Sequence, residues 1–146
     1  MSGVFFMVKY FVKDLQEEHK HITKELNIFN SEIDSTDNLP DVLEMLKRFL
    51  RKNLAYINRH LKKEKAFYKH LDKQLGNKVV LEELTASNEL IMEEIDRLRG
   101  IGEDSNIVEV KGFIKEFTDD MKDRMSIEEE TLFKIADYAL EEGMFE

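Results

Sequence analysis

The sequence predicts an all-α protein that folds as an up-down-up-down antiparallel four-helix bundle, with a single domain over residues 1–146. Apolar residues recur at spacings of three, four and seven in four long segments, which is the period of a helix, and no segment alternates with period two. The chain has one proline and is rich in Leu, Glu and Lys, a composition that suits long helices. Its apolar content of 42% is enough to form a core.

The first two helices are predicted over residues 8–33 and from residue 39 to the glycine at 76. The Asn-Leu-Pro-Asp segment at 38–41 favours a helix start, because proline fits the first turn and an acidic residue suits the positive end of the helix dipole. Gly76 and Asn77 form a stop signal. The first inward stripe is Phe11, Leu15, His19, Ile22, Leu26 and Phe29. The second is Leu43, Leu46, Leu50, Ile57, His60, Glu64, Phe67, Leu71 and Leu75.

The last two helices are predicted from residue 78 and over residues 107–141, on either side of a glycine-containing loop at 100–106. Gly112 weakens the first turns of the fourth helix by about 1 kcal/mol relative to alanine. The third inward stripe is Leu81, Leu84, Asn88, Ile91, Ile95 and Leu98. The fourth is Val110, Ile114, Phe117, Met121, Met125, Leu132, Ala136 and Leu140.

Composition argues against several classes of protein. The formal net charge of −9 disfavours a nucleic-acid or anionic-membrane surface, because phosphate groups bind clustered positive charge. The lack of cysteine excludes disulfides, iron–sulfur clusters and thiolate zinc sites. The apolar start at residues 1–8 has no basic segment or cleavage site, so it is predicted to belong to the fold rather than to a signal peptide. No apolar run approaches the ~20 residues of a membrane span, and the predicted location is cytoplasmic, with no membrane contact.

The segment at 58–72 recurs without gaps at 123–137. The first copy carries His60 and Glu64, which share one face of a helix because residues four apart are neighbours there. This His-x-x-x-Glu spacing suits a metal ion. The paired positions of the two copies include Arg59 with Arg124, His60 with Met125, and Glu64 with Glu129.

Each predicted helix places a polar residue on its apolar stripe. In a bundle, one inward polar position per helix at a similar depth defines a common site, and metal sites in bundle cores are built in this way. Buried carboxylates are costly unless they are paired or bind a cation. The alternative is structural: a histidine that only forms hydrogen bonds, a core methionine at 125 and a solvated acidic face at 128–130. The polar positions are His19, His60 with Glu64, Asn88, and Glu128 or Glu129 beside Met125.

Three stretches resemble the hemerythrin-like (HHE cation-binding) family. The Glu-His-x-x-Ile segment at 18–22 resembles the first-helix pattern of that family. Residues 59–69 resemble its second-helix H-H-x-K-E-E-x-x-L-F-P pattern, and residues 127–137 resemble its fourth-helix K-E-E-x-x-L-F-P-x-A pattern. The resemblance implies a four-helix bundle with a pair of non-heme irons, used in that family to bind dioxygen or to sense or handle oxygen, nitric oxide or iron.

The ligand set that the resemblance implies is only partly present. The family uses a histidine from each helix and a bridging glutamate from the second and fourth helices. Asn88 and Met125 stand where the third and fourth helices should supply histidine. Alignment on the Leu-Phe pair instead moves the ligand positions to Arg59 and Lys63 in the second helix and to Arg124 and Glu128 in the fourth, a set that is worse for metal. In either alignment the fourth helix has no histidine. The retained ligands are His19, His60, Glu64 and Glu129, with Glu128 as the alternative.

Three functional hypotheses follow. The favoured one is a divergent family member whose metal binding is weak, mononuclear or lost, with a structural or partner-binding role. The first alternative is a non-heme iron protein, with one or two irons, that binds or senses dioxygen or nitric oxide. The second is a heme-binding bundle in which Met125 pairs with His19 or His60. No residue combination argues for a substrate-turnover enzyme, and the apolar patch at residues 4–7 suggests a homo-oligomer or a protein partner.

Overall fold

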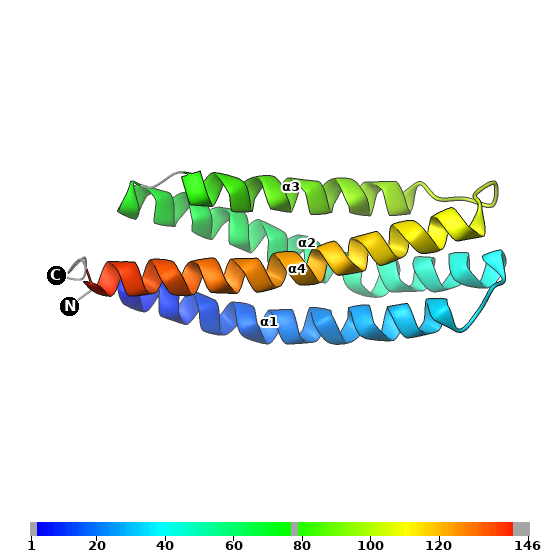
Figure 1. Ribbon diagram of the computed structural model, residues 1–146, viewed down its shortest axis with the longest axis horizontal. Helices are drawn as coiled ribbons and strands as arrows, with labels where there is room; N and C mark the ends of the chain where they lie inside the picture. Colours follow the sequence, from blue (N-terminus) through cyan, green and yellow to red (C-terminus); the bar gives the residue numbers. More distant parts are fainter. Residues whose placement is uncertain (1–2, 77–78, 142–146) are drawn as a thin grey trace.

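The computed structural model describes residues 3–76 and 79–141, and these residues form four α-helices. The helices run along one long axis in alternating directions, so that α1 begins and α4 ends at the same end of the bundle (Figure 1). Within the described ranges there is no strand. The predicted all-α, up-down-up-down bundle is therefore confirmed. The helices are α1 (Gly3–Asp34), α2 (Leu39–Leu75), α3 (Val79–Arg99) and α4 (Ile107–Glu141).

The four helices pack as a ring. Each helix contacts its two neighbours in the ring, in the order α1, α2, α3, α4, whereas α2 and α4 touch only slightly across the diagonal. Over the described residues, none of these helices combines the length and the apolar character needed to cross a membrane.

Local signals in the sequence set the helix ends. Asn38 caps α2, and its side chain accepts a hydrogen bond from the backbone N–H of Asp41. Gly76 ends α2 in the left-handed conformation, with φ of 65°, and its N–H donates to the carbonyl of Asp72. Asn106 caps α4, because its side-chain oxygen accepts hydrogen bonds from the two N–H groups at 108 and 109. These caps fix where the long helices start and stop, and therefore how deep each inward residue lies.

A layer of buried polar side chains divides the apolar core into two clusters. One cluster lies toward the α1–α2 and α3–α4 loops and includes Phe29, and the other lies toward the opposite end and includes Leu132. In α1, Leu15 belongs to one cluster and Ile22 to the other, and His19 lies between them. We call the dividing residues the polar layer; they are His19, His60, Glu64, Asn88, Arg124 and Glu128.

Most positions on the predicted stripes are buried. Leu50 and Phe67 are only partly buried and pack at the margin of the two clusters. Helix α1 begins five residues earlier than predicted. Some predictions concern side chains outside the described ones: the apolar patch at residues 4–7, Leu75, Asn77, Leu81, Ala136 and Leu140.

Candidate metal centre

Four side chains of the polar layer bring metal-binding atoms together at the centre of the bundle. One nitrogen or oxygen from each of His19, His60, Glu64 and Glu128 lies within 4.8 Å of those of the others. All four residues are at most 4% exposed. They come from three helices, α1, α2 and α4, so the antiparallel packing of the bundle creates the group.

A carboxylate outside the group orients each histidine. The Nδ1 atom of His19 lies 2.6 Å from Oε2 of Glu129, and Nδ1 of His60 lies 2.6 Å from Oε1 of Glu18. Because an ionised carboxylate only accepts hydrogen bonds, both Nδ1 atoms carry a hydrogen and donate it. In the neutral form of each ring, the Nε2 atom then has a lone pair directed into the centre. Metal-bound histidines typically show this arrangement, in which an outer carboxylate fixes the ring and its tautomer.

The Nε2 atoms face carboxylate oxygens at contact distance. His60 Nε2 lies 3.1 Å from Oε2 of Glu64, and His19 Nε2 lies 3.1 Å from Oε1 of Glu128. Two lone pairs cannot face each other at this distance without a proton or a metal ion to link them. Within the metal-binding group, four buried atoms lack a hydrogen-bond partner among the described residues: Nε2 of His19, Nε2 of His60, Oε1 of Glu64 and Oε1 of Glu128.

The donor set fits one metal ion. Ligand atoms that bind a single ion at about 2.1 Å lie about 3–4 Å from one another, and the central contacts fall in this range. Two imidazoles with two carboxylates form a set that suits ferrous iron, and also zinc. The orphaned atoms, their burial and their chemistry therefore fit a single divalent cation.

Arg124 occupies the part of the centre that α4 contributes beside Glu128. Its guanidinium is 3% exposed, and Nη1 lies 3.3 Å from Oε2 of Glu64 and 3.3 Å from Oε1 of Glu128. The other terminal nitrogen, Nη2, lies 3.4 Å from the hydroxyl of Tyr68. Arg124 is thus a fixed positive charge that contacts both carboxylates of the metal-binding group.

Protons and Arg124 balance the charges of the centre when it holds no metal. Burial raises the pKa of Glu128 well above its usual value, and the neighbouring Glu64 carboxylate adds to this effect. Burial also acts to raise the pKa of Glu64, but hydrogen bonds with Glu128 and the histidines, and the charge of Arg124, outweigh it and hold that pKa below its usual range. Burial lowers the pKa of His60, but its contacts with Glu64 and Glu18 outweigh this and raise the pKa. Since both shifts favour the protonated form of the side chain, a metal ion would compete with protons for Glu128 and His60.

The remaining residues singled out in the sequence lie outside the group. Glu129, predicted as a ligand, is half-buried and bonds to the far side of His19. Met125 is buried in the apolar cluster toward the loops. Asn88 is buried in α3, and both polar atoms of its amide lack a partner among the described residues.

Each of the two alignments with the family pattern gives the inward positions of one helix only. In α2 the inward pair is His60 and Glu64, whereas in α4 it is Arg124 and Glu128. A shift of one residue turns a side chain by about 100° around the helix. Counted in this way over the predicted stripe of α4, Glu128 lies about 40° from its centre, and Glu129 lies about 60° from it on the other side. The predicted stripe therefore separates the two glutamates only slightly, and the structure shows that Glu128 is the one that turns inward.

Sequence reasoning gave no role to Glu18 and treated Arg124 only as a poor ligand. Glu18 directly precedes His19 in α1, and its side chain extends to His60 in α2. It also accepts a hydrogen bond from Lys63 at 2.9 Å. Burial acts to raise the pKa of Glu18, but the hydrogen bonds from His60 and Lys63 outweigh it and lower that pKa. Glu18 therefore stays ionised and can hold the histidine ring.

Comparison with protein-family models gives one finding. Residues 10–136 match the model of the hemerythrin HHE cation-binding domain. The chain belongs to the hemerythrin family. Comparisons with curated proteins and with solved structures found no match. The position of the metal-binding group in this hemerythrin domain, at the centre of a four-helix bundle, agrees with a cation-binding role for the fold.

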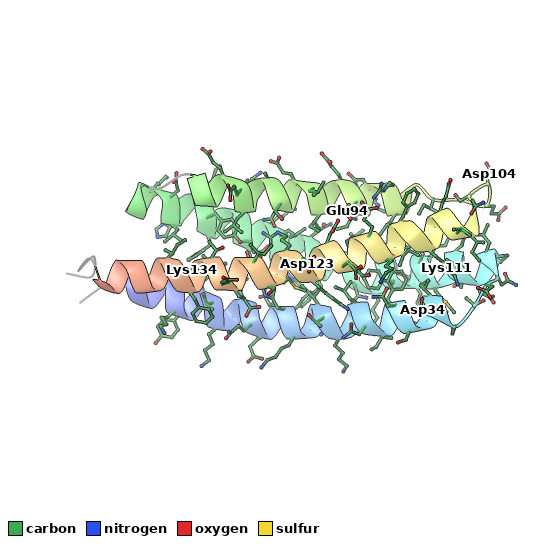
Figure 2. The ribbon with its side chains drawn as sticks, in the orientation of Figure 1. Asp34, Glu94, Asp104, Lys111, Asp123 and Lys134 are labelled. Atoms are coloured by element: carbon green, nitrogen blue, oxygen red, sulfur yellow. The ribbon has the colours of Figure 1, made fainter. Side chains whose placement is uncertain are left out.

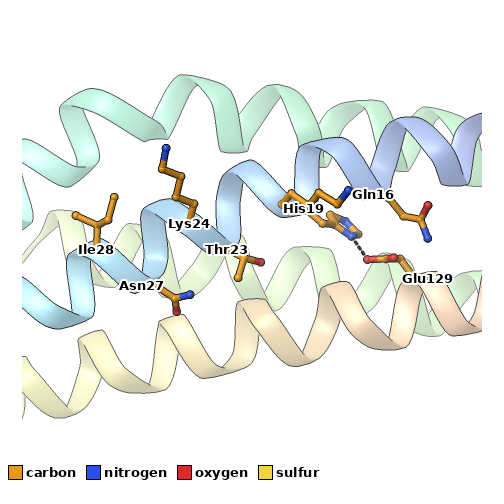
Figure 3. Close-up of a pocket in the computed structure, with 8 residues that line it drawn as sticks. Gln16, His19, Thr23, Lys24, Asn27, Ile28 and Glu129 are labelled. Carbon is orange, nitrogen blue, oxygen red and sulfur yellow. Dashed lines mark hydrogen bonds and ion pairs between the residues drawn. The ribbon is translucent and has the colours of Figure 1, made fainter.

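A surface groove of this hemerythrin domain reaches His19 and Glu129 at the edge of the metal-binding group. The groove has a volume of about 780 Å³, and His19 and Glu129 line one end of it. Figure 3 shows the His19 ring and the Glu129 carboxylate joined by their hydrogen bond, with Asn27 and Ile28 farther along α1. The remaining lining residues are Gln16, Lys20, Thr23 and Lys24. The edge of the buried site therefore lies beside space that a small molecule can enter.

Proposed function

We propose that this hemerythrin domain binds a single iron ion, that Arg124 takes the place of a second ion, and that the bound iron serves to bind or sense a small diatomic ligand, dioxygen or nitric oxide. The observation that carries the proposal is the convergence of four buried ligand side chains, each with one atom that lacks a hydrogen-bond partner among the described residues, next to a guanidinium that donates to both carboxylates. The residues that would hold the ion are His19, His60, Glu64 and Glu128.

The charge of Arg124 supports one ion rather than two. With an effective dielectric constant of about 20, each divalent ion at about 4 Å from the guanidinium is repelled by about 8 kcal/mol, so a second ion would add this cost again and would also be repelled by the first ion. The guanidinium also occupies hydrogen-bonding positions on both carboxylates, which a second ion would need. One divalent ion and one guanidinium together offset the two carboxylates without a second metal.

The other residues of the centre prepare the ligand atoms. Glu129 and Glu18 keep the hydrogens of both histidines on Nδ1, so that both Nε2 atoms stay available. Bound ferrous iron with four protein ligands supplies open coordination positions for a diatomic molecule. The groove beside His19 offers the approach from the surface. We propose a binding or sensing role rather than substrate turnover, since the groups around the ion serve to hold and orient it.

Metal analysis of matched variants tests the proposal. Glu128→Gln should lose most of the iron, because it removes a ligand oxygen. Glu129→Gln should retain iron with an affinity lowered by about 10- to 100-fold, since it removes only an orienting contact. Protein prepared without chelator and reconstituted with ferrous iron should carry one iron per chain. If reconstituted wild type carries none, the proposal is wrong and a structural role is supported instead.

The diatomic ligand is tested separately. Nitric oxide added to the ferrous protein without oxygen should change its optical and electron paramagnetic resonance spectra, and Glu128→Gln should show no such change. A protein that binds iron but gives the same spectra with and without nitric oxide would retain the metal site and contradict the sensing role.

A further inference from the structure

A second group of acidic side chains lies where α3 runs beside α4. Glu94 of α3 and Glu116 and Asp120 of α4 bring carboxylate oxygens within 4.8 Å of one another. Figure 2 labels Glu94 on the stretch of α3 that faces α4. Glu116 and Asp120 are four residues apart, so both carboxylates lie on one face of α4. Three carboxylates from two helices therefore point to one place.

Glu94 is buried without a partner. It is 5% exposed, and neither of its carboxylate oxygens has a hydrogen-bond partner among the described residues. A buried carboxylate in this state is costly unless a proton or a cation compensates it. Burial together with Asp120 and Glu116 raises the pKa of Glu94 to about 8. A proton, or a cation at the point where the three carboxylates meet, would therefore compensate this side chain.

The positive charge that the chain itself provides is small. Arg97 lies 3.6 Å from Glu116 through Nη2, and its guanidinium stacks over the ring of Phe113 at 4.5 Å from the centroid. Its side chain is 42% exposed, so solvent screens its charge. The nearby lysine of α4, Lys115, pairs with Asp119 instead. One exposed arginine faces three carboxylates, so the group keeps a net negative charge when all three are ionised.

We propose that Glu94, Glu116 and Asp120 form a second cation site, which binds a hard divalent ion such as Mn²⁺, Mg²⁺ or Ca²⁺. Carboxylate and water oxygens are the ligands that these ions prefer, and the exposed side of Glu116 leaves room for water. The site has no imidazole, so its preference differs from that of the histidine-containing centre. Asp120 and Glu128 are eight residues apart, about 12 Å along α4, so the two sites bind their ions separately.

Manganese binding to the full chain tests this site. Titration of Mn²⁺, followed by the loss of the free-ion electron paramagnetic resonance signal, should show that Glu94→Gln and Asp120→Asn each weaken one binding event at least tenfold. The adjacent exposed residue provides the matched control, because Glu93→Gln removes the same charge one position away. Arg97→Gln should tighten the same event, since it removes the competing cation.

The experiment separates Mn²⁺ binding at the second site from binding at the histidine-containing centre. The titrations are repeated in a His60→Ala background, where the second site should still bind one Mn²⁺ per chain that Glu94→Gln removes. If wild type binds no Mn²⁺ in that background at millimolar concentration, the proposed site is wrong. The same conclusion follows if Glu93→Gln weakens binding as much as Glu94→Gln, since that would show diffuse attraction to an acidic surface. If Glu94→Gln does not fold, Asp120→Asn tests the same site, since its position is only half-buried.

Discussion

Removal of the Arg124 charge is the sharpest perturbation of the centre. In Arg124→Met, a side chain of similar length keeps the packing but leaves Glu64 and Glu128 without their cation. At 3.3 Å and an effective dielectric constant of about 20, each of the two contacts amounts to about 5 kcal/mol of attraction before desolvation. Loss of one partner from a buried ion pair typically costs about 3–5 kcal/mol. For a chain of this size that corresponds to a fall in melting temperature of about 10–15 °C.

The assay is urea unfolding of chelator-treated protein, followed by circular dichroism. Arg59→Met is the matched control, because Arg59 is the counterpart of Arg124 in the sequence repeat and is exposed. It should change the free energy of unfolding by less than about 0.5 kcal/mol. Addition of a divalent metal ion should restore more stability to Arg124→Met than to wild type. If both variants lose the same small amount of stability, Arg124 is not the buried cation that the account requires.

Three further predictions concern other parts of the bundle. Gly112→Ala should raise the free energy of unfolding by about 0.5–1 kcal/mol in urea, because a Cβ at this helical position meets no atom within 4 Å; a decrease would show that the position needs glycine. Asn106→Ala should cost about 1 kcal/mol in the same assay, since the cap of α4 is lost; an unchanged stability would refute that role for the cap. The pH dependence of stability without metal should reveal Glu94, whose pKa is raised from 4.5 to about 8. Between these values the unfolded chain releases a proton that the folded chain keeps, so the contribution of Glu94 is full below about pH 4.5 and declines as the pH rises to about 8, by at most about 1.4 kcal/mol per pH unit. The difference in free energy of unfolding between wild type and Glu94→Gln should follow this decline, and a difference that does not vary with pH would contradict the raised pKa.

The fold could be predicted because the residues that specify each helix are spread along its whole length. Apolar residues at helical spacing, a proline-containing start at 38–41 and a glycine stop at 76 each act locally, so the four helices and their loops follow from the sequence. The inward positions of His19 and His60 follow for the same reason, because each interrupts an otherwise apolar stripe.

The composition of the centre was harder to predict. Glu128 and Glu129 differ by one residue, and the packing of Met125 into the apolar cluster fixes which of them turns inward. The role of Arg124 depends on two carboxylates from different helices, and the role of Glu18 depends on a histidine 42 residues away. Such contacts arise from tertiary packing, so no local sequence pattern predicts them.

The central claim is that the centre holds one iron because Arg124 takes the place of the second. The most direct measurement is the iron content of reconstituted wild type, of Asn88→His with Arg124→His, and of Asn88→His with Met125→His. The account predicts one, two and one iron per chain, since only the exchange at 124 removes the guanidinium and adds a ligand beside Glu128. Two irons in wild type, or a second iron in the variant at 125 but not in the variant at 124, would contradict it.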